Sequence, residues 1–124
     1  MARPRTILIV EDEPWLADSY AKALRTAKFR PVCVATAAAA IQAVDETPPK
    51  LIILDMMLPR VNGLQLLHEL RSYVDLDTVP VIICSNVQLP IKAADLQSYG
   101  VARILAKTKL TPASLVRAVR EVLA

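Results

Sequence analysis

The sequence predicts an α/β domain in which helices cover both faces of a parallel β-sheet. Short apolar runs, such as the one at 51–54, are bounded by polar or turn residues, which is typical of strands buried on both faces. A segment with helical periodicity follows each run, and this alternation favours βαβ units. With 124 residues and 54% hydrophobic residues, the chain is long enough to build its own core. We therefore expect one domain over residues 1–124.

Five strands are predicted from the apolar runs. They cover 7–10, 31–35, 51–54, 81–84 and 103–106. For a chain of this length, the natural arrangement is the doubly wound, flavodoxin-like order 2-1-3-4-5. That order makes the first and third strands direct neighbours.

Five helices are predicted between and after the strands. Pro14 and Pro112 suit the first helical turn, Thr36 and Thr111 can cap the helices that follow them, and Gly100 can end a helix in the left-handed conformation. The predicted helices run over 14–28, over 37–45, from the residue after Gly63 onward, from Pro90 to Gly100 and from Pro112 onward.

Composition excludes several classes of protein. The net charge of +3 comes from scattered cations and not from a basic block, so it does not predict direct nucleic-acid binding. No apolar run approaches the length of a membrane span, and the first is too short for a signal peptide, so we expect a cytoplasmic protein that does not enter a membrane. Cys33 and Cys84 fall in predicted strands and are expected to be small buried residues, not a disulfide or a zinc site.

Carboxylates follow two of the predicted strands. Glu11 and Asp12 come directly after the first strand, and Asp55 directly after the third. Because carboxyl ends of parallel strands share one edge, these side chains are expected to converge there. Like charges so close repel unless a cation lies between them. Oxygen ligands without a nearby cysteine or histidine favour Mg²⁺, for which Mn²⁺ could substitute.

Such a site suits phosphoryl transfer. Asp55 could attack a phosphorus centre and become an aspartyl phosphate. The ammonium of Lys107, after the fifth strand, would neutralise charge on the phosphoryl group, and the Ser85 hydroxyl, after the fourth, would donate to another of its oxygens.

The segments ILIVEDE, LIILDMMLPRVNGL, PVIICS and ILAK occur in this order and spacing across essentially the whole chain. In this the sequence resembles the receiver domain of a bacterial two-component response regulator, similar to the chemotaxis regulators. The resemblance implies that Asp55 is the phosphoacceptor and, with Glu11 and Asp12, a metal ligand. It also implies that the backbone carbonyl of Met57 is a further ligand. Ser85 would be the switch hydroxyl, and Lys107 the lysine that closes on the phosphoryl group.

The resemblance also implies partners. The phosphoryl donor would be a histidine kinase or a phosphotransfer protein. The chain would assist its own phosphorylation and dephosphorylation without turning over small substrates. Because the sequence ends with the fifth predicted helix, the output would be a downstream protein target or an output domain missing from this sequence, and a homodimer is possible.

Four positions depart from the family pattern. Thr108 stands where a proline is common, so a cis peptide bond is not expected after Lys107. Ile104 stands where an aromatic ring usually takes part in switching, so switching would follow another route or would be weak. Met57 and Val87 are apolar and cannot orient an attacking water, so we expect a long-lived phosphoryl group.

Three other functions share part of this pattern. A phosphatase of the haloacid dehalogenase type needs a second aspartate two residues after the nucleophile, where Met57 stands. A flavodoxin-like cofactor binder needs a glycine-rich phosphate loop after the first strand, where acidic residues would repel phosphate. A receiver-like interaction module without phosphorylation-driven switching stays open because of Ile104 and Thr108.

Overall fold

The computed structural model describes residues 3–58, 61–73, 78–85 and 98–124. Its main sheet has five parallel strands in the order β2-β1-β3-β6-β7. The strands are β1 (Thr6–Val10), β2 (Arg30–Val34), β3 (Leu51–Asp55), β6 (Val81–Ser85) and β7 (Val101–Ala106). Counted along the chain these are the five predicted strands, so the predicted order 2-1-3-4-5 is confirmed.

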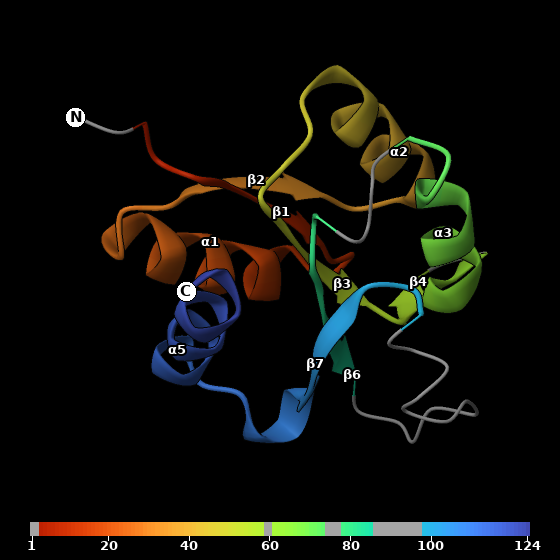
Figure 1. The fold of residues 1–124 in the computed structure, drawn as a ribbon. Coiled ribbons are helices and arrows are strands. Elements are labelled where there is room, and N and C mark those ends of the chain that lie inside the picture. The colour runs from red at the N-terminus through yellow and green to blue at the C-terminus, as the bar shows by residue number, and fades with distance from the viewer. Residues whose placement is uncertain (1–2, 59–60, 74–77, 86–97) are drawn as a thin grey trace.

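Helices lie on both faces of this sheet (Figure 1). The described helices are α1 (Pro14–Thr26), α2 (Ala37–Glu46), α3 (Gly63–Leu70) and α5 (Pro112–Leu123). One core cluster joins the sheet to α1 and α5 and includes Leu24 and Leu115. The other joins the opposite face to α2 and α3 and includes Val44 and Leu67. The helix predicted to begin at Pro90 lies outside the described residues.

Alternate residues of the central strands point to opposite faces. Ile7 and Ile9 belong to the cluster under α1 and α5, while Leu8 and Val10 belong to the cluster under α2 and α3. All four are at most 2% exposed. Both faces of the strand are covered, which is why the run is apolar throughout and does not alternate with polar residues.

The helix boundaries follow local chemistry. Helix α1 ends at Thr26, two residues before the predicted end, because Lys28 takes a left-handed φ of 74°. The N–H of Lys28 donates to the carbonyl of Arg25, and the N–H of Phe29 donates to that of Leu24, the pattern of a Schellman cap. Thr36 caps α2 as predicted, its hydroxyl accepting from the N–H of Ala39 at 3.1 Å.

Two further features differ from the sequence predictions. Cys33 is exposed, so its predicted burial is wrong, whereas Cys84 is buried as predicted. The reason is position: β2 is an edge strand, while β6 lies inside the sheet. The chain after β3 also forms an unpredicted antiparallel ribbon of β4 (Met57–Leu58) and β5 (Val61–Asn62).

Gly63 begins α3 at a close approach to the chain just after Asp55. Its N–H donates to the carbonyl of Met56 at 3.0 Å, and a side chain on Gly63 would place its Cβ 2.7 Å from the Met56 Cα. The absence of a side chain therefore lets the ribbon fold back beside the carboxyl end of β3. Within the described residues, no helix is both long and apolar enough to cross a membrane.

Candidate functional site

The predicted site residues are carried by four strands that end at one edge of the sheet. Asp55 is the last residue of β3, and Glu11 follows Val10, which pairs with Leu54. Ser85 ends β6 and pairs with Ala106 at the end of β7, directly before Lys107. Parallel pairing therefore places residues from four separate segments at one edge.

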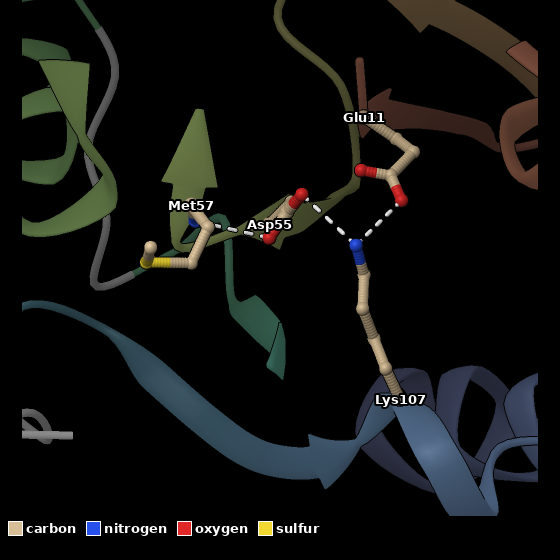
Figure 2. Close-up of polar contacts among 4 residues, drawn as sticks. All are labelled: Glu11, Asp55, Met57 and Lys107. Carbon is tan, nitrogen blue, oxygen red and sulfur yellow. Dashed lines mark hydrogen bonds and ion pairs between the residues drawn. The ribbon is translucent and has the colours of Figure 1, made fainter. Parts of the chain in front are cut away.

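The ammonium of Lys107 bridges two buried carboxylates (Figure 2). Its Nζ lies 2.7 Å from Glu11 Oε1 and 2.9 Å from Asp55 Oδ2. Glu11 is 3% exposed and Asp55 4% exposed. The backbone N–H of Met57 donates to the other Asp55 oxygen, Oδ1, at 3.0 Å. Asp55 is therefore held at both oxygens, while its partner Lys107 is shared with Glu11.

Glu11, Asp12 and Asp55 could together hold a metal ion. One carboxylate oxygen from each lies within 4.8 Å of the others. Glu11 Oε2 is buried and has no hydrogen-bond partner among the described residues. A buried anionic oxygen without a donor is costly, and a bound cation would remove that cost. The donor set is all oxygen, which suits a hard divalent ion such as Mg²⁺.

Burial controls the protonation of this cluster. It raises the pKa of Glu11 from 4.5 to about 7, Asp55 adds to the rise, and Lys107 opposes it. Burial by itself would lower the pKa of Lys107, but its bonds to Glu11 and Asp55 outweigh that effect, so the pKa is raised. The lysine thus stays a cation, and Glu11 becomes the group that responds to pH near neutrality.

Two groups beneath the site were not assigned to it from the sequence. Tyr20 and Cys84 belong to the core cluster under α1 and α5. Burial raises the pKa of both, that of the Cys84 thiol to about 12, and the carboxylates of the site contribute to each rise. Both groups are therefore neutral near pH 7 and add no negative charge to the acidic cluster. Cys84 directly precedes the predicted site residue Ser85, and this adjacency in the sequence could have indicated that Cys84 lies near the site.

The structure brings Glu11, Asp12, Asp55 and Lys107 together, as the sequence predicted. Ser85 is buried at the end of β6. The bridge from Lys107 to Glu11 was not expected, because the sequence assigned this lysine only to a phosphoryl group. The metal ligand role of the Met57 carbonyl and the catalytic roles of Asp55, Ser85 and Lys107 stay predictions.

The positions that depart from the family pattern are only partly described. Thr108 lies in a short 3₁₀ helix, Lys107–Lys109, and the described residues contain no cis peptide bond. Ile104 is 46% exposed on β7. Met57 is 62% exposed, while Val87 lies outside the described residues.

A five-stranded parallel sheet with a carboxylate cluster and a lysine at its carboxyl edge is the architecture of a signal receiver. The chain belongs to the response regulator receiver domain family, whose model matches residues 7–120. It is 43% identical over 75 residues to the transcriptional regulatory protein BaeR of Escherichia coli, a match covering 60% of this chain and 31% of BaeR. The chain thus spans about a third of that relative's length.

Solved structures agree on the fold. The signal receiver domain of a putative Luxo repressor protein from Vibrio parahaemolyticus has a TM-score of 0.83 and 28% identity, covering 97% of this chain and 90% of that one. A CheY-like receiver domain protein from Methanospirillum hungatei has a TM-score of 0.86 at 21% identity, covering 97% and 94%. The second comparison supports the fold alone.

Proposed function

We propose that the chain, as a single domain over residues 1–124, is a phosphorylatable receiver in which Asp55 takes a phosphoryl group from a phosphohistidine of a partner protein. The partner would be a histidine kinase or a phosphotransfer protein. The observation that carries this proposal is the buried Asp55 carboxylate, which lies 2.9 Å from the Lys107 ammonium beside two further carboxylates. Membership of the receiver family supports the same reaction.

The transfer exchanges one bond to phosphorus for another. An Asp55 oxygen attacks the phosphorus, the O–P bond forms, the N–P bond breaks, and the imidazole leaves and takes up a proton from solvent. Before transfer, Oδ1 accepts from the Met57 N–H and Oδ2 accepts from the Lys107 ammonium. Phosphorylation removes the negative charge of the Asp55 carboxylate, and Lys107 then finds new acceptors in the phosphoryl oxygens.

Glu11 and Asp12 would hold Mg²⁺ next to Asp55, together with the carbonyl of Met57. When bound, the ion neutralises negative charge on the phosphoryl oxygens. Ser85, the buried last residue of β6, would donate to one of those oxygens. Movement of Ser85 and Lys107 toward the new group would shift a pre-existing equilibrium between two conformations. The domain would act on its own aspartate and would not turn over small substrates.

The direct test is phosphorylation by acetyl phosphate with Mg²⁺. We expect the intact mass of the wild type to rise by one phosphoryl group. The mass of Asp55→Asn should not change, and neither should that of the wild type when a chelator removes Mg²⁺. Trp15 is 69% exposed at the start of α1, a few residues from Glu11 and Asp12, and its fluorescence is expected to respond to beryllium fluoride with Mg²⁺. An unchanged mass in a folded sample would refute the proposal.

Met57 supplies a prediction about lifetime. It borders Asp55, and its exposed thioether cannot orient a water toward phosphorus. Met57→Asn places a hydrogen-bonding side chain beside Asp55, and we expect the phosphate to be lost about 10-fold faster. This factor is below the roughly 10²–10⁴-fold that a well-positioned acid–base group contributes. Met57→Leu is the matched control and should keep the original decay rate. Equal decay of all three proteins in a phosphate-release assay would contradict the reasoning.

A further inference from the structure

A groove of about 740 Å³ lies between α1 and α5. In Figure 1 these two helices cover the same face of the sheet, and their residues line the groove together. Its apolar lining comes from small side chains, among them Ala23, Ala27, Ala113 and Val116. Short side chains in a groove between helices allow a third helix to approach closely. None of Glu11, Asp12, Asp55, Ser85 or Lys107 lines it.

The rim of this α1–α5 groove is positively charged. Lys22, Arg117 and Arg120 line it, and all three are exposed. Glu121 also lines it, but its carboxylate is taken by Arg103 at 2.7 Å. None of the three rim cations has an ion pair within the part of the chain that the structure describes. The groove therefore combines an apolar floor with uncompensated positive charge.

We propose that the α1–α5 groove binds an acidic amphipathic helix of a partner protein. The apolar stripe of such a helix would cover the alanines and Val116, and its carboxylates would face Lys22, Arg117 and Arg120. This inference stands on the groove alone and does not depend on phosphorylation of Asp55.

Charge and shape favour this occupant over two others. A second copy docking symmetrically would place the same patch against itself, and the three cations of each copy would oppose one another. A nucleic acid could pair with the cations through its phosphates. However, among the described residues no aromatic side chain on which bases could stack lines the groove. An acidic helix matches both the charge and the apolar floor.

The probe is a labelled synthetic peptide with leucines at helical core spacing and glutamates elsewhere, titrated by fluorescence anisotropy. Arg117→Glu with Arg120→Glu should weaken binding at least about 10-fold, because two attractive contacts become repulsive. Lys50→Glu with Lys109→Glu makes the same change in net charge at exposed positions outside the groove, and it should keep the original affinity within about 2-fold. The same peptide with lysines for glutamates should not bind.

A second variant tests the apolar floor separately. Ala113 is exposed in the first turn of α5, so Ala113→Gln fills the groove without adding charge or disturbing the core. We expect a loss of peptide binding with an unchanged circular dichroism spectrum. Equal weakening by both charge-reversal pairs, or tighter binding of a short DNA duplex than of the peptide, would overturn the proposal. So would self-association in sedimentation that the Arg117 and Arg120 reversals abolish.

Discussion

Removal of the Lys107 ammonium tests the electrostatics of the site most directly. Lys107→Met keeps much of the aliphatic stem but leaves the buried carboxylates of Glu11 and Asp55 without the cation that bridges them. Breaking a buried ion pair by removing one partner costs about 3–5 kcal/mol. Because Lys107 serves two carboxylates that are 3% and 4% exposed, we expect a loss within this range in metal-free buffer near pH 8.

The loss of unfolding free energy in Lys107→Met should be smaller at about pH 6 than at about pH 8. Burial already raises the pKa of Glu11 to about 7, and removal of the lysine, which opposes that rise, raises it further. At about pH 6 the folded variant can therefore hold Glu11 as the neutral acid, so the destabilisation shrinks by at most about 1.4 kcal/mol per pH unit. Mg²⁺ should restore part of the loss, about 2.7 kcal/mol at a concentration of 100 times its Kd.

Urea unfolding at both pH values, with a chelator and with Mg²⁺, gives the free energies of unfolding of the wild type and of Lys107→Met from the midpoint and slope. Lys109→Met is the matched control, since Lys109 is exposed in the same short 3₁₀ helix, and it should change stability by less than about 0.5 kcal/mol. A loss for Lys107→Met that is equal at both pH values and indifferent to Mg²⁺ would refute the bridging role.

Three further predictions concern metal binding, a cap and a close approach. Stabilisation of the wild type by Mg²⁺ should grow between about pH 6 and pH 8. The raised pKa of Glu11 means that the folded metal-free protein holds a proton on Glu11 near pH 6, and the ion must displace that proton. Without metal, the contribution of Glu11 to the free energy of unfolding is therefore full below pH 4.5 and is lost as the pH rises through about 7. Thermal shift with and without Mg²⁺ measures this, and a flat profile would contradict it. Thr111→Ala should cost about 1 kcal/mol, since the hydroxyl accepts from the Ser114 N–H at 3.1 Å; Thr111→Ser is the control. Gly63→Ala should destabilise by about 1–3 kcal/mol although alanine favours helices, because its Cβ would lie 2.7 Å from the Met56 Cα; a stabilised variant in urea unfolding would show that this segment shifts freely.

The strands could be predicted because their signals are local, and the sheet order followed from the alternation of strands and helices along the whole chain. Runs such as Leu51–Leu54 are short and apolar at every position, which is typical of a strand covered on both faces. Caps such as Thr36 were predictable for the same reason, since the capping hydroxyl and the helix start are adjacent in sequence. The left-handed Lys28 carried no such signal, because a lysine is rarely found at positive φ.

By itself, the sequence determined which residues the site can draw on: Glu11, Asp12, Asp55, Ser85 and Lys107 each stand at the end of an apolar run. Only the tertiary structure decided that Lys107 bridges Glu11 and Asp55, that Cys33 lies on an exposed edge, and that α1 and α5 form a cationic groove. These outcomes depend on side chains from segments far apart in the chain. Their distances and burial are set by packing, which local pattern does not encode.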